Sequence, residues 1–317
     1  MGNAKRTPEE FKRLMRGVVT IQFTPFKSVT EIDEGALRDN TQFMIENGLV
    51  EGRAVSVVGG SNGEGFSLSA SQYRQLIDVV IEEANGRVPV CVGCLRPAAQ
   101  PVIEIARYAE EAGADGIMVL GPHYYPNEPG DVVYAHFKAI ADATDIPIMI
   151  YNNLFVTGQD LSVDLLRRLA DIDQIVALKE CTPYTGKLRE VALHLADRFA
   201  LIPCYTCGMP LAYQLGAVGF ITLYGNFCPA VPLAMHDACL AHDFERAQEL
   251  YVRTLPLDSY GAAAVRAGGP GRETAIFKEA ARLAGRPMGA VERLPLVRPG
   301  EEERGLLHRL MIESGLL

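Results

Sequence analysis

Short segments that are apolar on both faces alternate with amphipathic segments along most of this 317-residue chain. Such apolar runs are typical of strands in a parallel sheet that helices cover, because a helix must return the chain between parallel strands. Eight strand and helix units close into a barrel. We therefore predict an α/β fold, a (β/α)8 TIM barrel with a helical C-terminal extension. The strands are expected at 17–26, 53–60, 88–93, 116–122, 146–152, 175–180, 200–204 and 218–226.

The same pattern divides the chain into three expected parts. Residues 1–16 are a charged N-terminal segment, residues 17–241 form the barrel, and residues 242–317 form the C-terminal extension. Beyond Pro229 the pattern is helical, and the glycine-rich sequence RAGGPGRE interrupts it. We expect the extension to pack on the barrel and not to be a separate catalytic domain. Its helices, with the last one of the barrel, are expected at 230–241, 243–255, 272–284 and 301–315.

The net charge of -9 comes from acidic residues that are spread along the chain. Nucleic acid and anionic membrane surfaces are therefore not expected as partners. The N-terminal segment lacks the apolar centre of a signal peptide, and glycine and proline interrupt the longest apolar region, which excludes a membrane span there. The sequence predicts a cytoplasmic protein without membrane contact.

Two C-x-x-C pairs occur among the seven cysteines, Cys91 with Cys94 and Cys204 with Cys207. That spacing can hold zinc or form a redox pair. Cys91, however, lies within an apolar strand, whereas such zinc sites usually lie in short turns. We interpret these cysteines as small buried hydrophobic side chains and expect no metal, with metal or redox use as the alternative.

Lys179 follows an apolar run at the end of the expected strand 175–180. The C-terminal strand ends form the active-site face of such a barrel. Alternation places Ile175, Ala177 and Lys179 on one face, and the small Ala177 suits the barrel interior, so Lys179 would point into the mouth. Loss of hydration there disfavours the charged amine, and a neutral amine can attack a carbonyl. The alternative is a lysine that extends into solvent or pairs with Glu180.

Two further segments are expected to end at the same face. Tyr151 ends the strand beside that of Lys179, where a phenol can shuttle protons during imine formation or simply cover the core. The glycine-rich turn that contains Gly60, Ser61 and Asn62 exposes backbone N–H groups that can hold a carboxylate. The turn matches neither nucleotide-binding fingerprint, so no nucleotide cofactor is expected.

Four motifs together resemble a known superfamily. The sequences GSNGEGFSLS, HYY, YNNLFVTG and ALKECT follow the second, fourth, fifth and sixth expected strands. Their order and spacing are similar to those of the dihydrodipicolinate synthase and N-acetylneuraminate lyase superfamily, whose members are class I, Schiff-base aldolases. The resemblance runs from about residue 14 to the C-terminus and includes the helical extension.

This resemblance implies a role for each matching residue. Lys179 would form an imine with pyruvate or another 2-oxo acid, and Tyr151 would act as general acid and base. Ser61 and Asn62 would hold the carboxylate of the 2-oxo acid and relay protons. Tyr125 would enter the site of a neighbouring subunit, which implies a homo-oligomer, either a dimer or a dimer of dimers (a homotetramer).

Departures from the superfamily pattern narrow the expected substrate. Val156 stands where dihydrodipicolinate synthases carry an arginine that binds the carboxylates of the incoming aldehyde, and valine cannot replace that clamp. Tyr205 lies where sugar-acid lyases carry acidic residues, so a long sugar acid is not expected. Asn62 replaces a threonine, and an amide does not exchange its proton as a hydroxyl does, so Asn62 either only orients the carboxylate or the proton travels by water. His123 would contact the second substrate or make a supporting hydrogen bond.

Three functions are compatible with these residues. The leading one is a lyase in which Lys179 binds pyruvate or a larger 2-oxo acid and a carbon–carbon bond to an aldehyde is made or broken. The second keeps the imine and ends in dehydration or deamination. The third is a barrel that binds a 2-oxo acid without catalysis.

Overall fold

The computed structural model describes residues 5–182, 184–204, 208–269, 271–293 and 296–317. Eight parallel strands are paired in the order β10-β1-β4-β5-β6-β7-β8-β9, and a bridge between Cys204 and Ile221 joins the two ends of this sheet. The predicted (β/α)8 barrel is confirmed. The strands are β1 (Gly17–Ile21), β4 (Ala54–Val58), β5 (Val90–Gly93), β6 (Gly116–Leu120), β7 (Ile148–Asn152), β8 (Ile175–Glu180), β9 (Ala200–Pro203) and β10 (Gly219–Thr222).

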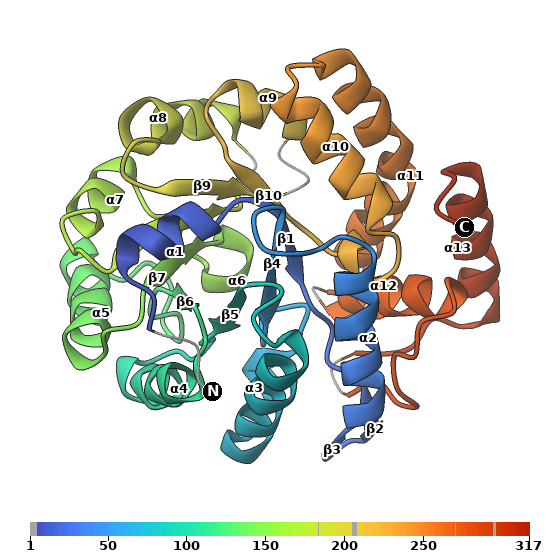
Figure 1. Ribbon diagram of the computed structural model, residues 1–317, viewed down its shortest axis with the longest axis horizontal. Helices are drawn as coiled ribbons and strands as arrows, with labels where there is room; N and C mark the ends of the chain where they lie inside the picture. The colour runs from blue at the N-terminus through green and yellow to red at the C-terminus, as the bar shows by residue number, and fades with distance from the viewer. Residues whose placement is uncertain (1–4, 183, 205–207, 270, 294–295) are drawn as a thin grey trace.

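Helices surround the strands on their outer side, as Figure 1 shows. Ser69 caps the helix that follows it, since its hydroxyl accepts a hydrogen bond from the backbone N–H of Gln72. A short antiparallel pair, β2 (Phe26–Ser28) and β3 (Glu31–Ile32), was not predicted. The barrel helices are α2 (Glu34–Glu46), α3 (Ala70–Ala84), α4 (Ala99–Ala112), α5 (Gly130–Ala143), α6 (Leu154–Thr157), α7 (Val163–Leu169), α8 (Thr185–Leu195), α9 (Met209–Gln214) and α10 (Ala230–Leu240).

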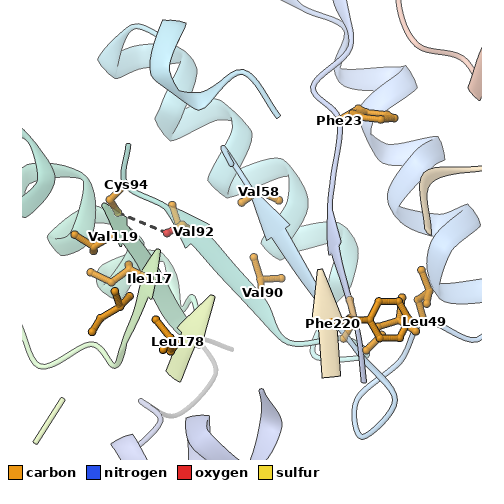
Figure 2. Close-up of a cluster of buried hydrophobic side chains, with 14 of the residues drawn as sticks. Phe23, Leu49, Val58, Val90, Val92, Cys94, Ile117, Val119, Leu178 and Phe220 are labelled. Atoms are coloured by element: carbon orange, nitrogen blue, oxygen red, sulfur yellow. Dashed lines mark hydrogen bonds between the residues drawn. The ribbon is translucent and has the colours of Figure 1, made fainter. Parts of the chain in front are cut away.

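Alternation along the strands separates two apolar clusters. One fills the barrel interior and includes Val57, Met118 and Met149; we call it the interior cluster. The other lies between strands and helices and is the outer cluster; Figure 2 shows part of it, including Val92 and Ile117. Both faces of each strand are therefore buried, which explains why the strands read as unbroken apolar runs.

The N-terminal segment contributes directly to the interior cluster. Helix α1 (Pro8–Leu14) begins with a capping box at Thr7, and its Phe11 and Met15 are fully buried in that cluster. A Cβ atom at Gly116 would come within 2.4 Å of the Phe11 ring, so glycine is required where β6 begins. These side chains close the barrel at the N-terminal ends of its strands.

Strand β8 contains an irregularity that the alternation did not predict. Ile148 pairs with Ile175, but the next residue, Met149, pairs with Ala177, so Val176 is an inserted residue. As a result Val176 belongs to the interior cluster and Ile175 to the outer one. The expected orientation is wrong for Ile175 because alternation resumes only after the bulge.

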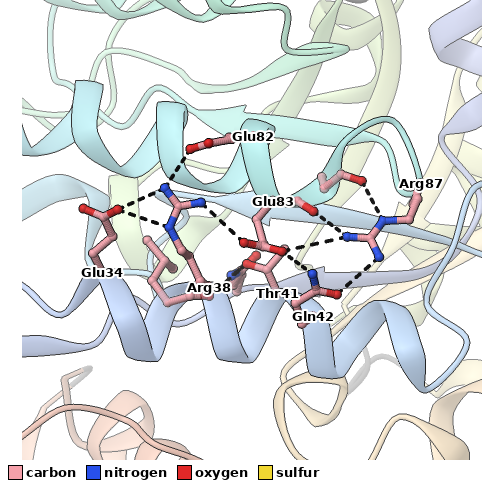
Figure 3. Close-up of polar contacts among 10 residues, drawn as sticks. Glu34, Arg38, Thr41, Gln42, Glu82, Glu83 and Arg87 are labelled. Atoms are coloured by element: carbon pink, nitrogen blue, oxygen red, sulfur yellow. Dashed lines mark hydrogen bonds and ion pairs between the residues drawn. The ribbon is translucent and has the colours of Figure 1, made fainter.

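Charged side chains join α2 to α3 on the outer surface (Figure 3). The guanidinium of Arg38 donates to Glu34 of its own helix and to Glu82 and Glu83 of α3, at 3.1, 2.7 and 3.4 Å. Arg38 is half-buried while Glu82 is exposed, so water screens much of this attraction and its contribution to stability is modest.

The C-terminal helices gather on one side of the barrel, coloured orange to red in Figure 1. They are α11 (Phe244–Gly268), α12 (Gly271–Leu283) and α13 (Glu301–Glu313). Helix α11 was expected to end at residue 255, yet it continues through Pro256, although proline removes one backbone hydrogen bond. Among the described residues, no helix is long and apolar enough to span a bilayer.

Asp258 on α11 is expected to make folding stability depend on pH. Burial raises the pKa of this carboxyl from 3.8 to about 7, although the Tyr224 hydroxyl donates to it at 2.9 Å. Because the unfolded chain releases this proton at lower pH, the folded state loses stability as pH rises from about 4 to about 7. The asparagine of Asp258→Asn is neutral at every pH. The variant's free energy of unfolding should therefore exceed that of the wild type by almost nothing at pH 4 and by on the order of 2–4 kcal/mol at pH 8.

Thermal denaturation of both proteins between pH 4 and pH 8 measures this difference. The exposed Asp142 is the matched control, since Asp142→Asn removes a surface carboxylate and should give no pH-dependent gain. An equal shift in melting temperature at every pH for Asp258→Asn would contradict the prediction.

Candidate active site

Lys179 and Tyr151 lie side by side at the C-terminal ends of their strands. They are register partners on β8 and β7, and each side chain is only 3% exposed. The Nζ atom of Lys179 lies 3.7 Å from the centre of the Tyr151 ring. The lysine therefore points into the barrel and neither extends into solvent nor pairs with its neighbour. A buried amine beside a phenol can attack a carbonyl and exchange protons with the adduct.

Two polar side chains contact the Tyr151 hydroxyl. The Ser61 hydroxyl lies 3.3 Å away, and the Asn153 amide nitrogen donates to it at 2.8 Å. These contacts join the loop after β4 to the strand end of β7. A hydroxyl, a phenol and an amide thus form one continuous polar chain above Lys179.

The loop after β4 is compact because it contains glycines. A Cβ atom at Gly60 would come within 2.8 Å of the Ile21 side chain, and one at Gly65 within 1.8 Å of the Gly59 carbonyl oxygen. Glu64 adopts left-handed backbone geometry with a φ of 59°. The loop is therefore held tightly against the barrel mouth, where Ser61 faces Tyr151.

Asn62 is directed away from the Tyr151 hydroxyl and toward the C-terminal extension. Its amide nitrogen donates to the Glu273 carboxylate at 3.0 Å and to the Thr274 hydroxyl at 3.1 Å, both at the start of α12. An amide nitrogen has two hydrogens, so these bonds use both. In this structure the Asn62 amide nitrogen anchors the loop to α12.

A buried ion pair makes a second link between the same two elements. The Lys278 ammonium on α12 is fully buried and donates to Glu64 at 2.7 Å and to the Thr24 carbonyl at 3.1 Å. It also lies 3.2 Å from Glu292. Burial raises the pKa of Glu64, and the charge of Lys278 opposes that rise. The extension therefore supports the loop that carries Ser61.

Glu180 follows Lys179 but faces the opposite side of β8. Its carboxylate accepts from the Asn152 amide at 3.0 Å and lies 3.6 Å from the ammonium of Lys187. Burial raises the pKa of Glu180 to about 6, while Lys187 and Asn152 act against that rise. The Glu180 carboxylate is thus engaged behind the strand and does not pair with Lys179.

The other predicted site residues lie around the mouth or outside the described residues. The His123 ring nitrogen Nδ1 lies 3.0 Å from the Gly121 carbonyl oxygen. Tyr125 is 67% exposed and packs edge-to-face on Tyr124, 5.0 Å between ring centres. Val156 lies on α6 and is 41% exposed. Tyr205 lies outside the described residues.

The disulfide in the structure does not join the cysteines of either C-x-x-C pair. Cys204 forms a disulfide with Cys181, which links the ends of β9 and β8, and Cys207 lies outside the described residues. Cys91 belongs to the interior cluster and Cys94 to the outer one, so their thiols do not converge, and burial raises the pKa of both. Within the described parts of the chain, no group of three or more histidine, cysteine, aspartate or glutamate side chains could hold a metal ion.

Asn153, Glu64 and Lys278 were not predicted as part of the site. Asn153 carried one local signal: an asparagine directly after a strand end and before a short helix is typical of a cap. For Lys278 no signal existed, because its partner Glu64 is 214 residues away in the sequence.

Comparison with known proteins agrees with this geometry. A model of the dihydrodipicolinate synthetase family matches residues 14–313. The chain is 33% identical over 306 residues to a 4-hydroxy-tetrahydrodipicolinate synthase of Methanococcoides burtonii, covering 96% of this chain and 100% of that protein. A protein of the same name from Syntrophus aciditrophicus is 33% identical over 308 residues, with 96% and 100% covered.

Solved structures show the same barrel. A prophage protein of the dihydrodipicolinic acid synthase family from E. coli K12, in complex with pyruvate, has a TM-score of 0.87 at 26% identity, covering 96% of this chain and 100% of that one. The chloride-inhibited dihydrodipicolinate synthase from Acinetobacter baumannii, complexed with pyruvate, has a TM-score of 0.84 at 26% identity with the same coverage. On the family match and these relatives, the chain belongs to the dihydrodipicolinate synthetase family, whose members are class I lyases that act through a Schiff base.

Proposed function

We propose that this lyase uses Lys179 to form an imine with pyruvate or a closely related 2-oxo acid. The single observation that carries the proposal is the buried Lys179 amine against the Tyr151 ring at the barrel mouth. Solved relatives that bind pyruvate support the choice of a 2-oxo acid. The protonated imine then accepts the electron pair when a carbon–carbon bond is made or broken.

Tyr151 and Ser61 are the proposed proton carriers. Tyr151 can give its proton to the hydroxyl of the first adduct, which leaves as water, and the contact with Ser61 offers a route for its return. We propose that the loop of Gly60 and Ser61 holds the carboxylate of the 2-oxo acid. We propose that Asn62 acts by anchoring that loop, a role that its hydrogen bonds to α12 support.

The second substrate is proposed to be an aldehyde that lacks a carboxylate beside the carbonyl. Phe155 and Val156 present apolar surface on α6, 70% and 41% exposed. Neither side chain can bind a carboxylate. Burying a substrate carboxylate against these two side chains, without a hydrogen-bond or charge partner, would cost on the order of several kcal/mol. Uncharged or apolar aldehydes fit this surface better.

A second copy of this chain is the proposed macromolecular partner. Tyr125 and Tyr124 are both largely exposed in one chain, 67% and 77%, and aromatic residues of this kind are enriched in interfaces. We propose that Tyr125 enters the site of the neighbouring subunit, in a dimer or a dimer of dimers. Sedimentation velocity measures the assembly.

Reductive trapping tests the proposed chemistry. We expect incubation of the protein with pyruvate and borohydride to attach one pyruvate-derived group to Lys179, located by peptide mass, because borohydride reduces the imine to a stable amine. Release of an aldehyde on incubation with an aldol product would then distinguish lyase activity from dehydration or deamination. A folded protein that traps none of several small 2-oxo acids would contradict the proposal.

A further inference from the structure

Asn153 makes the shorter of the two hydrogen bonds to the Tyr151 hydroxyl, 2.8 Å against 3.3 Å for Ser61. An amide nitrogen can only donate, so the phenol oxygen accepts from Asn153. The one hydrogen of the phenol is then free to point toward Ser61 or toward a substrate on Lys179. Asn153 therefore sets the direction in which Tyr151 can give its proton.

The amide of Asn153 is itself fixed. Its oxygen accepts from the backbone N–H of Phe155 at 2.9 Å and so caps the first turn of α6. Its backbone oxygen accepts from the Thr157 hydroxyl at 3.0 Å. With the oxygen held by the helix, the nitrogen must face the phenol. The other asparagine near this loop, Asn62, has both amide hydrogens engaged with α12.

We infer that Asn153 is a positioning residue that orients the Tyr151 phenol and stabilises its anion during imine formation, an inference that rests on the proposed function. When the first adduct of Lys179 and the 2-oxo acid loses water, Tyr151 transfers its proton to the departing hydroxyl and the nitrogen lone pair forms the C=N bond. The products are an iminium cation, a phenolate and one water molecule. A hydrogen bond donated to the phenolate is charge-assisted and stronger than the bond to the neutral phenol, so it lowers this barrier.

The substitution Asn153→Asp separates this role from helix capping. Aspartate caps helices as well as asparagine does, so the bond from Phe155 is kept, but a carboxylate oxygen replaces the donor and repels the phenolate. We expect imine formation with pyruvate to slow about 100- to 1000-fold, the usual loss when one positioned hydrogen-bond donor to a developing anion is removed. The alkaline limb of the pH profile of kcat/KM should move to higher pH, and the melting temperature should stay near that of the wild type.

Two further variants serve as controls. Asn153→Ser keeps a capping oxygen, but its shorter side chain does not reach Tyr151. It should therefore slow imine formation while the fold stays intact. The serine variant also tests the inference if the aspartate variant does not fold. In a Tyr151→Phe background there is no phenol oxygen to stabilise, so Asn153→Asp should cause little further loss.

The outcomes separate this inference from the proposed function. If the wild type forms no borohydride-trapped adduct, the proposed function is wrong and the inference fails with it. If the wild type forms the adduct but Asn153→Asp forms it at the wild-type rate and pH dependence, only the inference is wrong. An equal loss of rate with and without the Tyr151 hydroxyl would also overturn the inference, since Asn153 would then act through the fold alone.

Discussion

Replacing Lys179 with methionine is expected to abolish trapping of pyruvate and to lower lyase activity by at least about 10⁴-fold, the scale observed when a covalent nucleophile is removed. Methionine has a similar length and no amine, so the site keeps its shape but cannot form the imine. Because Lys179 is 3% exposed, the change also removes a polar group from an apolar setting. Melting temperature should therefore be equal to or higher than that of the wild type.

Lys187→Met is the matched control for this experiment. Lys187 lies eight positions further along the chain and is also shielded, with 12% of its side chain exposed, but it contacts Glu180 and Asp160 behind the strand. Its loss should lower stability and leave the adduct at Lys179 intact. The prediction fails if Lys179→Met still yields the pyruvate adduct, or if Lys187→Met eliminates it.

Replacing Lys278 with methionine is expected to lower the free energy of unfolding by about 3–5 kcal/mol, the usual effect of breaking a buried ion pair. The change leaves the carboxylates of Glu64 and Glu292 buried without this cation. Since an unpaired buried carboxyl binds a proton more readily, the stability deficit should shrink as pH falls from 8 to 5. Imine formation should slow as well, because Glu64 lies in the loop that carries Ser61.

Chemical denaturation and trapping kinetics measure these two effects. Adding Glu64→Gln to Lys278→Met should restore part of the lost stability, since the glutamine carries no charge. Lys138→Met is the control: that lysine is 47% exposed and pairs with Asp142 on the surface, so its loss should change stability by less than about 0.5 kcal/mol. Equal effects at positions 138 and 278 would contradict the proposed support of the loop by α12.

The barrel could be predicted because its strands are buried on both faces, and each such strand is recognisable from a run of consecutive apolar residues. The site could be predicted in part for a similar reason: Lys179 and Tyr151 each end an apolar run, and parallel strands bring their C-terminal ends together. Alternation then gave the correct face for both residues, because the bulge at Val176 precedes Lys179.

What the sequence could not predict depends on contacts between distant segments. The pairing of Cys181 with Cys204 depends on which strand ends are adjacent, whereas C-x-x-C spacing pointed to Cys207. The contacts of Asn62 with α12 join residues more than 200 positions apart. Helix α11 continues through Pro256, so the packing of this helix outweighs the unfavourable effect of a proline inside it.

Helix α1 has a kinetic consequence. Because Phe11 and Met15 fill the barrel at the strand ends opposite Lys179, we expect both reactants to enter and leave at the C-terminal strand ends. Lys179 is 3% exposed, so a 2-oxo acid bound to it as proposed would lie deeper than the exposed Phe155 on α6. On the proposed function we therefore expect a compulsory order, in which the 2-oxo acid binds first during addition and leaves last during cleavage.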